Sequence, residues 1–146
     1  MYGEEYTDEF GEIRPSSLKA IRDVFREHEP LVEATVLDDF DPRKLLVHYS
    51  EGFEEPGRFD IRWSKKNNYN FHYTEGDELD FRYDRHPNGH SPEKHFHAPD
   101  HEESGEAVKS CIHVERDKLV ALAVIQLWRE AWEENDVSLL NQGNPP

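Results

Sequence analysis

The sequence YNFHYTEGDELDFRYD, residues 69–84, contains two runs in which apolar and polar residues alternate, separated by a turn signal. Alternation with a period of two places one kind of side chain on each face of a β-strand. The apolar positions of the two runs are Tyr69, Phe71, Tyr73, Leu79, Phe81 and Tyr83. Residues 75–78, which include Gly76, favour a turn between the runs. The stretch therefore predicts an antiparallel hairpin with one aromatic face and one polar face.

Three more strands are predicted before this hairpin. Residues 31–40 and 44–50 are rich in β-branched and aromatic side chains, and a turn signal at 41–43 separates them, so they are expected to form a first hairpin. Residues 59–63 alternate in the same way as the runs at 69–84. Together these segments predict an antiparallel sheet of about five strands. Its polar positions include Arg62, His72, Asp80, Arg82 and Asp84.

Two helices are predicted to cover the aromatic face of the sheet. The first spans about residues 18–29, with Ser16 and Ser17 as candidate N-caps. The second spans about residues 115–134 and has a wide apolar face. The sequence therefore predicts an α+β fold, in which an antiparallel sheet is flanked by an N-terminal helix and a long C-terminal helix. Residues 107–114 remain open between a short final strand and irregular structure.

The chain of 146 residues is long enough for one domain with a hydrophobic core. Residues 1–15 contain five acids and one base and are predicted to be an acidic disordered tail. Residues 16–135 form the predicted single α+β domain, and residues 136–146 are predicted to be a flexible C-terminal tail. Cys111 is the only cysteine, so neither an intramolecular disulfide nor a cysteine-based zinc site is expected.

The net charge of −15 arises from 32 acidic and 17 basic residues. Such acidity is typical of proteins that stay soluble in a salt-rich cytoplasm, and an acidic protein from a low-salt cell is the alternative. No signal-peptide pattern is seen and no apolar run approaches about 18 residues, so a cytoplasmic protein that does not enter a membrane is predicted. Residues 58–97 contain seven bases and seven acids, and this neutral part is expected to repel an anionic ligand least.

Five of the nine histidines follow the second strand of the hairpin within a short segment. They are His86, His90, His95, His97 and His101. Histidine is the side chain best suited to proton transfer or metal ligation near neutral pH. In an extended segment, residues i and i+2 point to the same side, so His95 and His97 are expected to reach one common partner.

A divalent metal ion is one candidate partner. The candidate ligands are His90, His95 and His97 together with Asp100 or His101, which offer imidazole and carboxylate groups to zinc or a similar ion. The spacing around the histidine pair is similar to the first metal motif of cupins. A cupin barrel needs further strands, whereas a long helix is predicted to follow here, so a cupin fold is disfavoured and the metal site stays open as a hypothesis.

Acid–base cleavage of RNA is the leading hypothesis, because it needs proton-transfer groups and cations but no metal ion or other cofactor. Two of the three residues His90, His95 and His97 are expected to share the proton transfers. The expected phosphate-binding residues are Arg82, Arg85 and Lys94. The alternative is a loop whose histidines form only structural hydrogen bonds, in a module that binds a protein partner without catalysis.

The segment FRYDRHP, residues 81–87, followed by the histidine pair that ends at His97, resembles the TumE-type toxin family of prokaryotic toxin–antitoxin systems. The resemblance spans roughly residues 18–97 and implies a short α+β domain. The positions that match the family are Tyr83, Asp84, His95 and His97. The resemblance therefore adds Tyr83 and Asp84 to the histidines as candidate catalytic residues.

The resemblance also implies a biological role. A member of this family is expected to be a small cytoplasmic toxin encoded beside a DNA-binding antitoxin, and the acidity of this chain suggests a haloarchaeal-like member. RNA is the expected target by analogy with other small toxins of similar size. A divalent-metal-binding or non-catalytic regulatory module remains the competing prediction.

Overall fold

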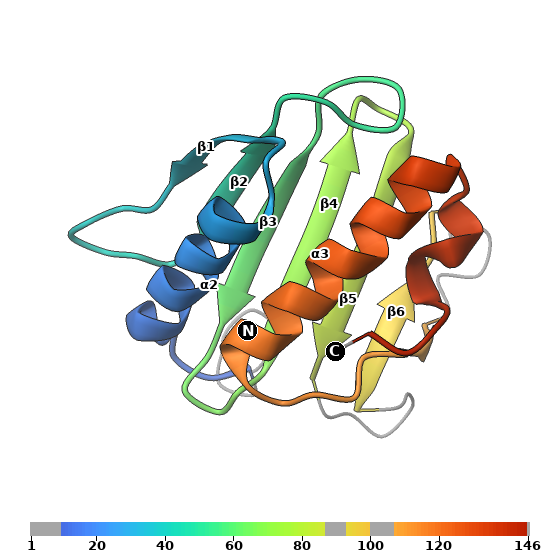
Figure 1. The fold of residues 1–146 in the computed structure, drawn as a ribbon. Coiled ribbons are helices and arrows are strands. Elements are labelled where there is room, and N and C mark those ends of the chain that lie inside the picture. The colour runs from blue at the N-terminus through green and yellow to red at the C-terminus, as the bar shows by residue number, and fades with distance from the viewer. Residues whose placement is uncertain (1–9, 87–92, 100–106, 146) are drawn as a thin grey trace.

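A computed structural model describes residues 10–86, 93–99 and 107–145 of the chain. Within these residues a seven-stranded antiparallel sheet has its strands in sequence order, and two helices lie on one of its faces (Figure 1). The elements are α2 Pro15–His28, β1 Val32–Val36, β2 Leu45–Tyr49, β3 Arg58–Trp63, β4 Tyr69–Glu75, β5 Leu79–Arg85, β6 Lys94–His97, β7 Val108–Lys109, α3 Asp117–Glu134 and the 3₁₀ helix η2 Val137–Asn141. The predicted α+β class and its two flanking helices are confirmed.

The five predicted strands correspond to β1–β5, and the described sheet has two more. The histidine pair lies in one of them, because residues 94–97 form β6 and pair with β5. Residues 107–114, which the sequence left open, contain the two-residue strand β7. Alternation is recognised over about 4–8 residues, so β6, with four residues, is at the lower limit and β7, with two, is below it. The sequence-based prediction of about five strands therefore missed these two short strands.

The two helices begin and end close to their predicted limits. Helix α2 has Arg14 at its N-cap and Pro15 at its first position, where the missing N–H of proline costs no helical hydrogen bond. Ser16 and Ser17 consequently lie in the first turn, and neither is the N-cap. Helix α3 ends at Asn135, whose left-handed conformation (φ 53°) is a common way to terminate a helix.

The core lies between the helices and one face of the sheet, and it is largely aromatic. The buried aromatic side chains of the strands are Tyr49, Phe59, Trp63, Tyr69, Phe71, Tyr73, Phe81, Tyr83 and Phe96. Trp128 of α3 packs against Tyr49 with ring centroids 4.4 Å apart. Burial of each large apolar side chain stabilises a fold by roughly 1.5–3 kcal/mol. The expectation that the aromatic side of the sheet meets the helices is confirmed.

Residues beyond both ends of the predicted domain, 16–135, also take part in this packing. Phe10 is buried, and its carbonyl accepts a hydrogen bond from the Asn68 side chain. Leu140 of η2 is also buried. Phe10 and Leu140, which lie in the predicted N-terminal and C-terminal tails, are therefore packed against the domain, while residues 1–9 lie outside the described range.

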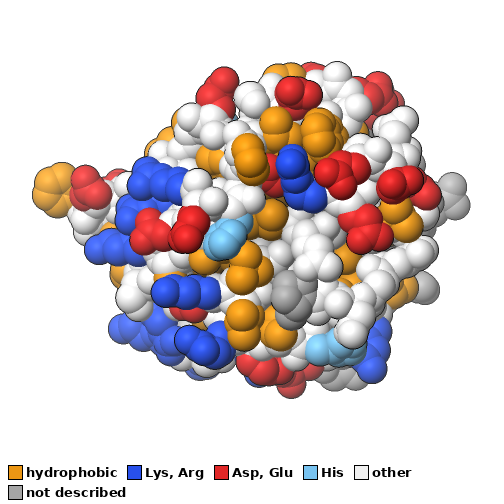
Figure 2. All heavy atoms as spheres, in the orientation of Figure 1, with side chains coloured by type: hydrophobic (Ala, Val, Ile, Leu, Met, Phe, Trp, Pro, Cys, Tyr) orange, Lys and Arg blue, Asp and Glu red, His pale blue; other side chains and the backbone are white. Residues whose placement is uncertain are grey.

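Figure 2 shows the helix-bearing side of the molecule, where charged side chains are unevenly distributed. Lys and Arg side chains gather toward α2, and Asp and Glu side chains are more frequent toward α3. Among the described residues, no helix is long and apolar enough to span a bilayer. The opposite face of the sheet carries no described helix, and polar side chains such as Arg82 and Asp84 lie on it.

Candidate functional site

A cluster of polar side chains lies on the sheet face that points away from the helices. Asp84 comes from β5, and His95 and His97 come from β6. In the antiparallel register Asp84 lies opposite His95, and Arg82 lies opposite His97. Because alternate residues of a strand share a face, this register brings two residues from each strand together. We call Arg82, Asp84, His95 and His97 the polar-face cluster.

Asp84 is the centre of the polar-face cluster. Its Oδ2 atom lies 2.8 Å from Nε of Arg82, 3.3 Å from Nε2 of His97 and 3.4 Å from Nε2 of His95. The two imidazole rings have centroids 5.2 Å apart and are nearly perpendicular. Asp84 and His95 are buried, whereas the Arg82 side chain is 38% exposed. One carboxylate oxygen thus collects three cationic or protonatable groups, of which Arg82 is the most accessible.

The other oxygen of Asp84 is held by a residue that the sequence did not single out. Asn70 of β4 donates from Nδ2 to Oδ1 of Asp84. Arg62 of β3 in turn donates two hydrogen bonds to Oδ1 of Asn70, at 2.7 and 3.2 Å. The Arg62 guanidinium also stacks over the Phe10 ring, 4.4 Å from its centroid. A chain of contacts across three strands therefore fixes the orientation of the Asp84 carboxylate.

The electrostatics of the cluster favour an ionised Asp84. Burial by itself raises the pKa of a carboxyl group, because it removes water from the charged form. Here the hydrogen bonds with His95 and His97 and the charge of Arg82 outweigh that burial, and together they hold the pKa of Asp84 well below its usual range. Asp84 is therefore an acceptor that orients the imidazoles at neutral pH, and a proton-transfer role for it is not favoured.

His97 lies between two groups that make opposite demands on one nitrogen. Nη2 of Arg82 is 3.1 Å from Nε2 of His97, and Oδ2 of Asp84 is 3.3 Å from the same atom. Arginine is only a donor, so its contact requires a lone pair on Nε2, whereas a carboxylate requires a proton there. Neither protonation state of Nε2 can therefore satisfy both neighbours at once.

Tyr83, a predicted catalytic residue, lies on the other face of β5. Its side chain is fully buried, its hydroxyl donates to the carbonyl of Leu140, and burial raises the pKa of the phenol well above its usual value. The structure therefore does not bring Tyr83 to the polar-face cluster. Its contacts are those of a core residue that fastens η2 to the sheet.

Arg85, a predicted phosphate-binding residue, also points away from the cluster. It forms an ion pair of 2.7 Å with Glu93 and donates to the backbone carbonyls of Lys66 and Asn67. Its odd-numbered position in β5 places it on the same side as Tyr83. These contacts join β5 to the turn after β3.

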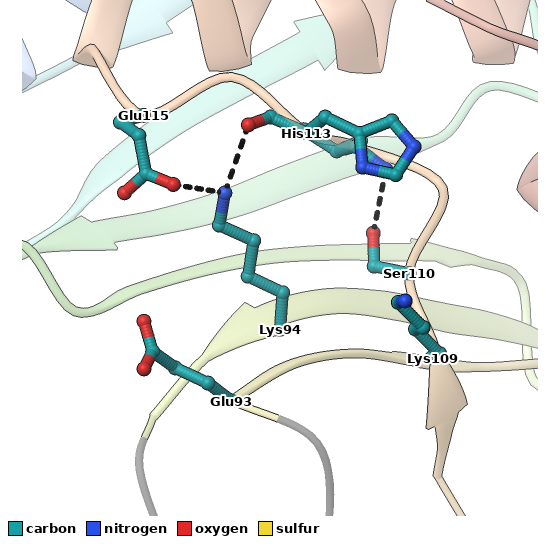
Figure 3. A pocket seen from close by; sticks show the side chains of 7 residues that line it. Glu93, Lys94, Lys109, Ser110, His113 and Glu115 are labelled. Atoms are coloured by element: carbon teal, nitrogen blue, oxygen red, sulfur yellow. Dashed lines mark hydrogen bonds and ion pairs between the residues drawn. The ribbon is translucent and has the colours of Figure 1, made fainter.

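Lys94, the third predicted phosphate-binding residue, lies at the edge of a hollow of about 350 Å³ beside β6 and β7 (Figure 3). Its Nζ atom donates to the carbonyls of His113 and Val114 and to the carboxylate of Glu115. An ammonium group has three protons, and these three contacts match them. Lys94 therefore holds the segment before α3 against the sheet, away from Arg82 and the histidines.

The remaining predicted ligands and catalytic groups, His90, Asp100 and His101, lie outside the described residues. Among the described residues, Asp84, His95 and His97 could hold a metal ion, since one ligand atom from each lies within 4.8 Å of the others. Arg82 supplies a cation beside these groups. The cluster thus combines a buried carboxylate, two imidazoles and a guanidinium in one place.

Comparison with known proteins gives one finding. The family model described as Toxin TumE matches residues 18–133, which is most of the chain. The matched range includes β1 to β7 and all four residues of the polar-face cluster. No match was found among curated proteins, and none was found among solved structures.

Proposed function

The chain belongs to the TumE toxin family, and we propose that it is the toxin of a toxin–antitoxin pair and cleaves RNA by metal-independent acid–base catalysis. The observation that supports this activity is the convergence of Arg82, His95 and His97 on the buried carboxylate of Asp84. These are the groups that such a reaction needs: two that exchange protons, one cation and one residue that orients them.

In the proposed reaction the RNA 2′-oxygen attacks the adjacent phosphorus. One histidine takes the proton of the 2′-hydroxyl, and the other donates a proton to the 5′-oxygen as the P–O5′ bond breaks. The products are a 2′,3′-cyclic phosphate and a free 5′-hydroxyl. We assign the first step to His97, because its side chain is more exposed than that of His95 (13% against 8%) and lies beside Arg82. His95 then supplies the proton to the leaving oxygen.

Arg82 is the proposed phosphate-binding group. Its guanidinium borders the two histidines and is the most exposed member of the polar-face cluster. A guanidinium binds phosphate through paired N–H donors and stabilises the charge that develops on it. The neutral balance of residues 58–97 also supports binding of an anion here, because the rest of this chain with a net charge of −15 repels one more strongly.

The proposal includes a partner and a setting. We propose that a DNA-binding antitoxin, encoded beside this chain, neutralises it in the cytoplasm. The acidity of the chain further supports a high-salt setting, since salt screens repulsion between carboxylates. A free energy of unfolding that rises with KCl concentration would agree with this, and one that is independent of KCl would contradict it.

Expression in a halophilic host tests the toxin activity. We expect the wild-type chain to arrest growth and the double variant His95→Ala/His97→Ala to allow it. His72→Ala is the matched control: His72 lies on the same sheet face, opposite Arg82 in the strand register, but its ring contacts Asp80 and it is not a member of the cluster. This control should arrest growth like the wild type. Equal growth of cells that express the wild type and the double variant, with the wild type harmless, would contradict the proposal.

A further inference from the structure

Three atoms of the polar-face cluster have the spacing of ligands around one metal ion. Oδ2 of Asp84 is 3.4 Å from Nε2 of His95 and 3.3 Å from Nε2 of His97. Bonds of about 2.0–2.1 Å in a tetrahedral zinc site separate two ligand atoms by roughly 3.3–3.4 Å. Two of the three separations therefore already equal those of a zinc site. One ligand atom from each of the three side chains lies within 4.8 Å of the other two, so small imidazole rotations can complete the set.

The chemistry of the donors selects the class of metal. Two imidazoles and one carboxylate suit divalent first-row ions such as zinc, whereas magnesium and calcium prefer oxygen ligands throughout. The ligand side chains are largely shielded from water, with exposed fractions of 6% for Asp84, 8% for His95 and 13% for His97. The set leaves a fourth coordination position for water.

The residues around the ligands also resemble the support of a metal site. Asn70 donates to Oδ1 of Asp84, the oxygen that faces away from the histidines, and Arg62 fixes Asn70. Hydrogen bonds of this kind orient metal ligands and contribute to affinity. The carboxylate is thus held so that Oδ2 points toward both imidazole nitrogens before any ion arrives.

We propose that Asp84, His95 and His97 bind one divalent first-row metal ion, and that the bound ion inhibits RNA cleavage. The binding half rests on this geometry, and the inhibition rests on the proposed function. The ion binds Nε2 of both histidines through their lone pairs, so neither nitrogen can accept a proton or carry one to the leaving oxygen in the cleavage step. It also competes with Arg82, whose Nε occupies the same Oδ2 at 2.8 Å and whose Nη2 contacts Nε2 of His97.

The competition with Arg82 separates the metal-bound state from the cleavage-competent state. The Arg82 side chain is 38% exposed, so it can leave Asp84 and turn toward solvent when a metal ion binds. When the Arg82 guanidinium moves away, its positive charge no longer repels the metal ion at Oδ2 of Asp84. Arg82 is therefore required for the proposed cleavage but opposes the proposed metal binding, and this difference distinguishes the two activities.

The sequence had suggested a different ligand set for this metal. It combined His90, His95 and His97 with Asp100 or His101, all from one segment. The new set keeps the histidine pair and takes its third ligand, Asp84, from the neighbouring strand. Asp84 is identified as the third ligand only by the register between β5 and β6, which places it opposite His95.

Isothermal titration of the metal-stripped full chain with ZnCl₂ tests the binding. We expect one ion per chain for the wild type, affinity at least about tenfold lower for His97→Gln, and tighter binding for Arg82→Met. His72→Gln is the control, because it removes a histidine from the same face outside the cluster, and its affinity should equal that of the wild type. Far-UV circular dichroism checks that each variant is folded. Absence of stoichiometric binding, or equal losses in His72→Gln and His97→Gln, would overturn the site.

A cleavage assay distinguishes this inference from the proposed function. We expect the metal-stripped chain to cleave RNA in a chelator, and the same chain to lose cleavage in chelator-free buffer that contains one equivalent of zinc. Cleavage in the chelator without zinc binding would refute the metal site and leave the proposed function standing. Zinc binding by a chain that does not cleave RNA in the chelator would retain the site, but would refute both the inhibition and the proposed function.

Discussion

Two buried carboxylates at opposite ends of the same hairpin differ in the groups that satisfy them. Glu75 ends β4 on the helix-bearing face, and Asp84 lies near the end of β5 on the other face. Glu75 accepts hydrogen bonds from the backbone N–H groups of residues 53, 54 and 55 and from the Tyr73 hydroxyl. It therefore fastens the loop between β2 and β3 to the sheet.

Asp84 receives its contacts from side chains instead. The partners are Asn70, Arg82, His95 and His97. Backbone N–H groups can only hold a carboxylate, whereas imidazoles can exchange protons and a guanidinium can bind phosphate. Burial of a carboxylate therefore does not by itself indicate a functional site. The chemistry of the groups that surround it is what separates an anchor from a candidate active site.

The largest expected difference between the two residues is in RNA cleavage. Asp84→Asn removes the charge that orients both histidines, so the cleavage rate should fall at least about 100-fold, within the range that acid–base catalysis contributes. Glu75→Gln should cleave at the wild-type rate under conditions where it is folded. Single-turnover cleavage measures both. Equal rates for the two variants would remove the distinction between anchor and site.

Stability should show the next largest effect. Glu75→Gln replaces one acceptor oxygen by an NH₂ group that faces backbone donors, and we expect a loss of about 3 kcal/mol in the free energy of unfolding, since buried donors lose their partners. Urea unfolding followed by circular dichroism measures it. Glu78→Gln, in the turn that follows, is a surface control that should leave stability unchanged. A loss for Glu75→Gln no larger than for this control would contradict the anchoring role.

Removal of Asn70 should have a smaller effect on both properties. Asn70→Ala leaves Oδ1 of Asp84 without its donor, so the carboxylate is free to rotate away from the histidines. We expect a loss of about 1 kcal/mol in stability and a fall of about tenfold in cleavage, in line with the loss of other supporting hydrogen bonds. Thr74→Ala, on the same face of β4, is the control. Unchanged cleavage by Asn70→Ala would show that Asp84 needs no such support.

The pH dependence of stability should be the subtlest difference. The pKa of Asp84 is held low in the folded state, chiefly because its histidine and arginine contacts outweigh burial. Its contribution is therefore present above the unfolded pKa of about 3.9 and is lost as pH falls through the lower folded value. The destabilisation caused by Asp84→Asn should thus be full at neutral pH and shrink in acid. A destabilisation that grows in acid would contradict the assignment.

The buried carboxylate of Glu29 should change stability with pH in the opposite direction to Asp84. Burial raises its pKa, partly offset by the Leu31 N–H and the charge of Arg129. Its contribution is therefore present below the unfolded pKa and is lost as pH rises through the higher folded value. Glu29→Gln cannot ionise, so its stability relative to the wild type should increase as pH rises from acid to neutral. Thermal unfolding across this range measures the trend.

Much of the fold follows from local pattern. Alternation in residues 69–84 identified the central hairpin and its aromatic face, and the apolar face of the C-terminal segment identified the helix that covers it. The same alternation contains information about the site: Arg82 and Asp84 share one face of β5, whereas Tyr83 and Arg85 share the other. Candidate residues that are adjacent in sequence were therefore divided between two faces by the pleat of a single strand.

Other parts of the site depend on strand register, which local sequence does not determine. The pairing of Glu75 with Leu79 across the turn places Asn70 opposite Asp84, but that pairing depends on the geometry of the turn. The pairing of Asp84 with His95 depends on a connection that includes residues outside the described range. The burial of Glu29 and Glu75 likewise follows from how distant segments pack, so their sequence context gave no signal.

RNA cleavage by the purified chain in the presence of a chelator tests most directly whether the polar-face cluster is a catalytic site. The substrate is end-labelled RNA at high KCl, and the ends of the products are identified. We expect the wild type and His72→Ala to produce 2′,3′-cyclic phosphate and 5′-hydroxyl ends, and His95→Ala/His97→Ala to be at least about 100-fold slower. Absence of cleavage by the wild type, or an equal rate for the double variant, would contradict this function.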